Sequence, residues 1–139
     1  MKLFPLSTLL IFVLLFSHVK AQEFNFEASV ERGSTLYSSN CSSCHMVNGT
    51  GMQGVYPPLT GADSLMNDIP RLVVSILEGV EGTTKVNGVE YNGTMQSYSL
   101  TDKEVADLLN YMRNSWGNEG EIIVPEEIQP ALEKENKEQ

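Results

Sequence analysis

Three segments of the chain carry apolar residues at spacings of three and four, the pattern of a helix with one buried face. This pattern predicts helices over residues 29–40, 69–78 and 101–116. In the first of them, Gly33 and Tyr37 lie four positions apart on the same face. We therefore expect three main helices, each with one side packed against a shared core.

Local signals mark the ends of the second and third helices. Asp68 suits the N-cap of the second helix and Gly79 its end. The third helix opens on a Thr-Asp-Lys-Glu capping box at residues 101–104, in which two side chains bond to orphan backbone amides. Gly117 stands where a left-handed C-terminal cap belongs. The third helix should be the most sharply bounded of the three.

The remaining segments are irregular or polar. Residues 45–60 hold three glycines and two prolines, which predicts a wrapped loop. Val-Asn-Gly-Val at residues 86–89 predicts a tight two-residue turn in a small, peripheral hairpin. Beyond Gly117 the chain becomes acidic, and we expect residues 118–139 to form a weakly packed arm with at most a short helix near Pro125.

The first 21 residues look like a targeting segment rather than part of the fold. Lys2, an apolar run over residues 9–16 and small residues before Gln22 are typical of a secretory signal. The apolar run is shorter than the roughly 20 residues that a membrane helix needs. We expect an exported, periplasmic protein without a membrane span after cleavage, with an uncleaved N-terminal anchor as the alternative.

The charge of the chain limits the kinds of partner that it is expected to bind. The sequence has nine basic and eighteen acidic side chains, and because Lys2 and Lys20 fall in the signal, the mature chain carries a net charge of −11. Nucleic acid is excluded as a partner on this ground. The charge favours protein partners with basic docking faces, although acidity also keeps exported proteins soluble. On the third helix, we expect Asp102, Glu104 and Asp107 to form a solvated face, with a docking patch for a partner as the alternative.

The two cysteines carry the clearest chemistry. Cys41-Ser42-Ser43-Cys44-His45 places two thiols three residues apart and a histidine beside the second, the arrangement that attaches a covalent haem. A disulfide between these thiols would close too small a loop to stabilise a fold. Structural zinc requires further cysteine or histidine ligands, which the mature chain lacks, and a thioredoxin-like pair belongs beside a strand. We therefore expect His45 to be one axial iron ligand.

A methionine is the expected ligand on the other side of the iron, because a thioether suits an electron-transfer haem. Met46 adjoins the histidine and cannot cross to the opposite face. Met112 lies on the apolar side of a helix, where core packing is the simpler role. Met95 follows Asn-Gly-Thr on an irregular segment that the capped helix would fix, so we predict it as the ligand. The other candidates, which suit surface or packing positions, are Met52 and Met66.

These residues resemble the class I c-type cytochromes, specifically the small bacterial kind, over residues 30–117. In that family a helix containing glycine and an aromatic residue crosses the C-terminal helix. Gly33 and Tyr37 match the first helix, and Leu108 and Tyr111 match the second, all with packing roles.

The resemblance also implies a haem pocket. It implies that a proline twelve residues after the haem histidine bonds to it through a backbone carbonyl, and that a leucine two residues later packs on the haem. Pro57 and Leu59 occupy these positions, and Pro58 is adjacent to both. Such a bond would fix the orientation of the His45 ring.

The segments 86–95, 100–104 and 111–118 look like the haem domains attached to copper nitrite reductases and to membrane alcohol dehydrogenases. Gln96 departs from those relatives, which usually have proline after the ligand methionine. A copper reductase domain needs histidines that this chain lacks, so any catalytic partner must be another polypeptide.

We therefore predict a division into a signal peptide at residues 1–21, a cytochrome c domain at 22–117 and the acidic arm at 118–139. The fold should be all-α, with three to five helices around one haem that forms much of the core. We expect a monomeric single-electron carrier and no enzyme, and an apo form that is poorly folded. The alternatives are a fixed subunit of a respiratory or dehydrogenase complex, and a haem-based peroxidase or gas sensor if Met95 is labile.

Overall fold

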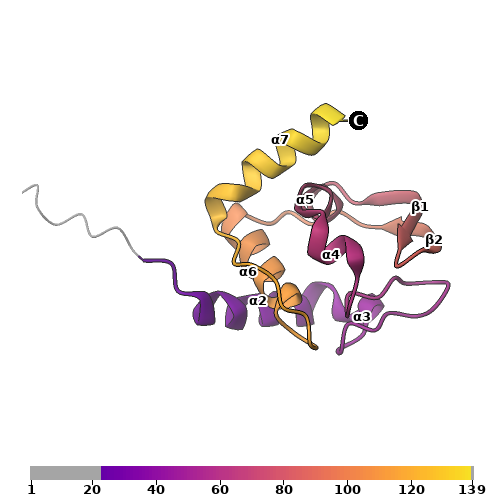
Figure 1. Ribbon diagram of the computed structural model, residues 1–139, viewed down its shortest axis with the longest axis horizontal. Helices are drawn as coiled ribbons and strands as arrows, with labels where there is room; N and C mark the ends of the chain where they lie inside the picture. Colours follow the sequence, from indigo (N-terminus) through magenta and orange to yellow (C-terminus); the bar gives the residue numbers. More distant parts are fainter. Residues whose placement is uncertain (1–22, 139) are drawn as a thin grey trace, which may run out of the picture.

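The computed structural model describes residues 23–138, so the predicted signal peptide lies outside the described residues. Figure 1 shows the long helix α2 crossing α6, with the hairpin at one side and α7 at the top. The elements, in chain order, are α2 (Phe26–Asn40), α3 (Ser42–His45), α4 (Asp63–Asn67), α5 (Ile69–Leu77), β1 (Val80–Val86), β2 (Val89–Met95), α6 (Asp102–Arg113), the 3-10 helix η1 (Pro125–Glu127) and α7 (Ile128–Glu138).

The three predicted helices are present as α2, α5 and α6. Helix α2 begins three residues earlier than predicted, because the Asn25 side chain accepts a hydrogen bond from the amide of Ala28 and caps it. Asp68 caps α5, and the capping box of α6 forms between Thr101 and Glu104. None of the described helices is long and apolar enough to cross a membrane.

The fold is helical but not strictly all-α, because β1 and β2 form an antiparallel two-stranded sheet. The predicted turn is present, and Asn87 and Gly88 adopt left-handed φ angles of 52° and 78°. Each strand has seven residues, and Val80 pairs with Met95 at the far end. The predicted small hairpin is present, but the prediction of an irregular segment at Met95 is wrong, since Met95 is the last residue of β2.

The hairpin is also not peripheral, because its turn is bonded to α4. The Asp63 backbone amide donates to the Asn87 side-chain oxygen over 2.9 Å, and the Asn87 amide donates back to the Asp63 carboxylate over 2.9 Å. Val86 and Tyr91 are buried in the core on the inner side of the sheet. These contacts fix the hairpin, and with it Met95, relative to the helices.

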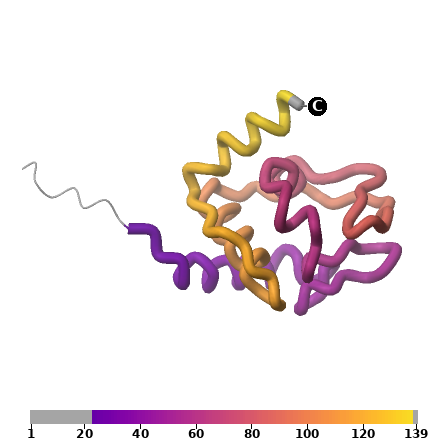
Figure 2. Tube along the Cα trace, viewed as in Figure 1, coloured from indigo at the N-terminus to yellow at the C-terminus, as the bar shows by residue number. Residues whose placement is uncertain are grey.

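Helices α2 and α6 cross at Gly33, where the missing side chain lets the two backbones meet. A Cβ at this position would lie 1.9 Å from the carbonyl oxygen of Asp107 and 2.8 Å from the Cβ of Tyr111. No larger residue fits there without separating the helices. Figure 2 shows the crossing along the Cα trace, where the violet α2 passes the orange α6. The crossing brings together the first and the last helix of the predicted cytochrome region.

Asp107 corrects one sequence-based expectation, because it is buried at this crossing and does not belong to a solvated face. Its carboxylate accepts hydrogen bonds from Ser29 Oγ over 2.6 Å, Arg32 Nε over 2.6 Å and Lys103 Nζ over 2.7 Å. Burial opposes ionisation, but the bonds from Arg32, Lys103 and Ser29 outweigh it and hold the pKa of Asp107 below its usual range. The carboxylate joins α2 to α6.

The expectation of a weakly packed C-terminal arm is wrong for most of its length. Ile123 and Ile128 are buried, and α7 packs against α5. The Asn110 side chain bonds to both backbone groups of Ile123, donating to its carbonyl and accepting from its amide over 2.8 Å each. The segment is therefore part of the packed structure, and its helix has eleven residues.

Candidate functional site

The two cysteines and the histidine lie at the end of α2, where the helix continues through Cys41 into α3. The Cys41 amide donates to the Tyr37 carbonyl over 2.9 Å, and the His45 amide donates to the Cys41 carbonyl over 2.9 Å. Both thiols are free. Burial, and then the nearby Cys44, raise the pKa of the Cys41 thiol to about 11, so that it is neutral at physiological pH.

The His45 ring is held by a backbone carbonyl. Its Nδ1 lies 2.9 Å from the carbonyl oxygen of Pro57, so of the two adjacent prolines that the sequence offered, it is Pro57 that bonds to the ring. Burial lowers the pKa of His45 against the opposing effect of the Pro57 bond, so the ring is neutral at pH 7. With Nδ1 donating to Pro57, Nε2 is left with a free lone pair, the form that binds a metal ion.

The loop that carries Pro57 is braced by aromatic residues. Tyr37 donates its hydroxyl proton to the Met46 carbonyl over 2.6 Å, at a residue with a left-handed φ of 65°. The Tyr37 ring also packs on Tyr111 and Trp116, with centroids 5.4 and 5.0 Å away. Trp116 in turn covers Gly49, where a Cβ would lie 2.6 Å from the indole ring. The α2–α6 crossing thus sets the position of the loop.

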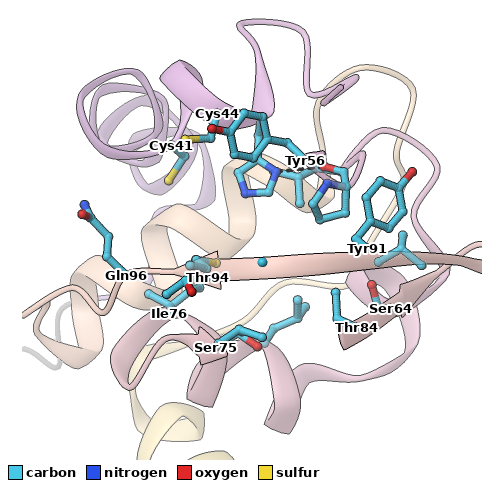
Figure 3. A pocket seen from close by; sticks show the side chains of 18 of the residues that line it. Cys41, Cys44, Tyr56, Ser64, Ser75, Ile76, Thr84, Tyr91, Thr94 and Gln96 are labelled. Atoms are coloured by element: carbon cyan, nitrogen blue, oxygen red, sulfur yellow. Dashed lines mark hydrogen bonds between the residues drawn. The ribbon is translucent and has the colours of Figure 1, made fainter. Parts of the chain in front are cut away.

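The histidine and both cysteines line a cavity of about 830 Å³, a size typical of cofactor sites. In Figure 3, Cys41 and Cys44 lie on one side of this cavity, and Ser75, Ile76 and Thr94 lie on the other. The walls are largely apolar. They include Leu59, Leu72, Val86, Leu108, Met95 and Met112.

The structure separates the candidate methionines. Of those in residues 23–138, Met95 and Met112 line the cavity, whereas Met46, Met52 and Met66 do not. Met112 is 4% exposed and belongs to α6, as expected of a core residue. Met95 is partly buried and directly follows Thr94, which Figure 3 shows on the side of the cavity away from the cysteines.

Sequence reasoning missed the residues that support Met95. Tyr98 donates its hydroxyl proton to the Asn40 carbonyl over 2.7 Å, and its amide donates to the Ile76 carbonyl over 2.9 Å. Gly79 lies so close to this segment that a Cβ would come within 2.6 Å of the Met95 carbonyl oxygen. Nothing local in the sequence distinguishes Tyr98 from a surface tyrosine, because its partners lie in the distant helices α2 and α5.

The surface around the cysteines has an unusual composition for so acidic a chain. Residues 33–62, which include both cysteines, His45 and the loop after them, contain no Asp, Glu, Lys or Arg. Three exposed large apolar residues, Val47, Met52 and Val55, lie in the same loop. This segment is therefore a neutral surface on a strongly negative molecule.

Comparison with known proteins agrees with this geometry, since the sequence profile of the cytochrome c family matches residues 30–116. The chain belongs to the cytochrome c family. It is 38% identical over 91 residues to cytochrome c-552 of Thermus thermophilus, an alignment that covers 62% of this chain and 69% of that protein.

Other relatives are subunits of larger assemblies. The chain is 33% identical over 88 residues to the cytochrome c subunit of a quinone alcohol dehydrogenase from Gluconobacter oxydans, across 62% of this chain and 18% of that subunit. It is 30% identical over 112 residues to the gluconate 2-dehydrogenase cytochrome c subunit of Pantoea cypripedii, across 76% of this chain and 24% of that protein. The chain therefore spans less than a quarter of these dehydrogenase subunits.

Membership of the cytochrome c family means that the cofactor is covalently bound haem c, one for a domain of this size. The cavity fits such a group. It offers two free thiols, a neutral imidazole with an available nitrogen, a thioether and apolar walls. Electron transfer is the function that this family supports.

Proposed function

We propose that this cytochrome is an exported carrier of single electrons whose haem is attached through Cys41 and Cys44 and ligated by His45 and Met95. The observation that carries the proposal is that one cavity receives both thiols, the free imidazole nitrogen and the Met95 segment from opposite sides. When bound, haem c supplies a one-electron couple at its iron.

Each residue in this arrangement has a separate task. The thiols of Cys41 and Cys44 fix the cofactor covalently, and the Pro57 carbonyl orients the His45 ring through the 2.9 Å bond at Nδ1. Leu59 and the other apolar residues of the wall exclude water from the cavity. The thioether of Met95 would hold the iron together with His45, and an iron without an open site would favour outer-sphere electron transfer over the binding of oxygen or peroxide.

Absorption spectra with and without carbon monoxide test this assignment. The wild-type protein, produced with haem-maturation machinery, should show a c-type spectrum that carbon monoxide does not change. Met95→Ala should bind the gas readily, whereas Met112→Leu, which alters the other methionine of the cavity, should behave like the wild type. If Met112→Leu opens the iron and Met95→Ala does not, the ligand assignment is wrong.

A second proposed function is a fixed subunit of a dehydrogenase complex. The relatives named as dehydrogenase cytochrome c subunits favour it. Affinity purification from the native membrane and soluble fractions distinguishes the two, because a subunit co-purifies with a larger oxidoreductase in constant ratio. A monomeric protein that co-purifies with no larger oxidoreductase supports the carrier.

Ready binding of carbon monoxide by the wild type would instead favour a peroxidase or a gas sensor.

The partners of a carrier would be redox proteins with basic docking faces, as the net charge suggests. Of the three acidic residues on α6, Asp107 is buried, so only Asp102 and Glu104 are accessible to a docking partner. Reversing the charge of Asp102 and Glu104 should weaken the salt dependence of electron transfer to such a partner. An unchanged salt dependence would exclude this face as the docking site.

A further inference from the structure

The haem cavity has a polar end opposite its cysteines. In Figure 3, Cys41 and Cys44 lie at one end, while Ser64 and Thr84 lie at the other. Arg71, on the first turns of α5, also lines the cavity and donates from its guanidinium to Thr84 Oγ1 over 3.0 Å. A hydroxyl from α4, a hydroxyl from β1 and a guanidinium from α5 therefore meet at this end.

Arg71 is distinctive in its charge. Among the described residues that line the cavity, Arg71 is the only basic residue apart from His45, and Asp68 is the only acidic residue. Asp68 is already engaged in capping α5 through the Arg71 backbone amide. The ion pairs within residues 23–138 do not include Arg71, whose exposed side chain is bonded to a neutral hydroxyl. The guanidinium can thus take an anionic partner without breaking an ion pair.

The chemistry of haem c supplies such a partner. Its macrocycle carries the two thioether attachments on one edge and two propionate carboxylates on the opposite edge. Attachment at Cys41 and Cys44 therefore directs the carboxylates towards the far end of the cavity. Arginine is the side chain best matched to a carboxylate, because its planar fork donates two parallel hydrogen bonds.

We propose that Arg71, together with Ser64 and Thr84, binds a haem propionate and raises the reduction potential of the cytochrome. This inference rests on haem attachment as described under the proposed function. A positive charge close to the iron favours the reduced form, which carries one positive charge less than the oxidised form. A guanidinium fixed on the propionate also offsets the negative charge that the carboxylate places beside the iron.

Potentiometric titration of the holoprotein tests this role. Arg71→Gln should lower the equilibrium constant for one-electron reduction by about three- to tenfold, the range expected for one partly solvated charge. Arg71→Lys, which keeps the charge without the fork, should lose less. Lys85→Gln is the matched control, since it removes a cation from the residue next to Thr84 that does not line the cavity, and it should leave the potential nearly unchanged.

The spectrum of each variant separates this inference from the proposed function. If Arg71→Gln keeps the wild-type spectrum and shifts the potential no more than Lys85→Gln, the propionate role is wrong while the carrier function stands. If the wild type itself lacks covalent haem, the proposed function fails. Should Arg71→Gln not mature, nuclear Overhauser contacts in the wild type decide, because Arg71 side-chain protons must lie near propionate methylene protons, and their absence overturns the proposal.

Discussion

Replacing Gly33 with alanine tests how tightly the α2–α6 crossing is packed. The added Cβ would lie 1.9 Å from the Asp107 carbonyl oxygen, whereas ordinary contact begins at 3.4 Å, so the helices must move apart by about 1.5 Å. Overpacking of this kind costs about 1–3 kcal/mol and sometimes more. The shift would also stretch the bonds from Ser29 and Arg32 to the Asp107 carboxylate, at about 1 kcal/mol each.

Helix propensity makes the opposite prediction, because alanine is about 1 kcal/mol more favourable than glycine inside a helix. The sign of the change therefore decides between the two effects. We expect Gly33→Ala to lower the free energy of unfolding by about 3 kcal/mol, since the steric cost and the stretched bonds together exceed the gain in propensity.

Guanidinium denaturation of the haem-loaded protein, followed by far-ultraviolet circular dichroism, measures this change. Ser38, an exposed residue of the same helix, provides the control. There the alanine variant should be more stable than the glycine variant by about 1 kcal/mol. If Gly33→Ala is as stable as the wild type or more stable, the close crossing is not what Gly33 provides.

Three further outcomes follow from the structure. Asp107→Asn should lower the free energy of unfolding at pH 7 by about 2 kcal/mol. Because the folded pKa of Asp107 is depressed, its contribution is complete above the unfolded value and is lost as the pH falls through the folded value, so denaturant titrations at pH 7 and below pH 3 should show this difference shrinking. Asn110→Ala leaves the amide and carbonyl of Ile123 without their partners, and hydrogen exchange at that amide should accelerate while stability falls by about 1–3 kcal/mol. Cys41→Ser with Cys44→Ser should abolish a cooperative thermal transition, because the small core depends on the cofactor; a sharp calorimetric peak would contradict this.

The parts of the fold that the sequence predicted well are those encoded by neighbouring residues. The capping box at residues 101–104, the Asp68 cap and the Asn87-Gly88 turn each depend on residues a few positions apart, and each is present. The attachment motif is also local. Its spacing indicated covalent haem, which family membership confirms.

The features that were mispredicted depend on distant partners. Asp107 resembles a surface acid within α6, and its burial depends on Ser29 and Arg32, which lie more than 70 positions away. The C-terminal segment has few apolar residues, but Ile123 and Ile128 are buried in the core. Residues from earlier helices form that core, so the local sequence does not reveal the burial. The length of the hairpin follows from its pairing between Val80 and Met95 rather than from its turn.

The neutral segment over residues 33–62 also determines how the molecule orients in an electric field. All of the acidic residues lie in other parts of the chain, and Figure 1 places α7, which follows the acidic η1, far from α3. The separation gives the protein an electric dipole with its negative end away from the cysteines. On a positively charged electrode the acidic end should adsorb and leave the cysteine face in solution, whereas an apolar coating should hold Val47 and Val55 against the surface. Electron exchange should therefore be faster on the uncharged coating, even though the charged surface binds more protein.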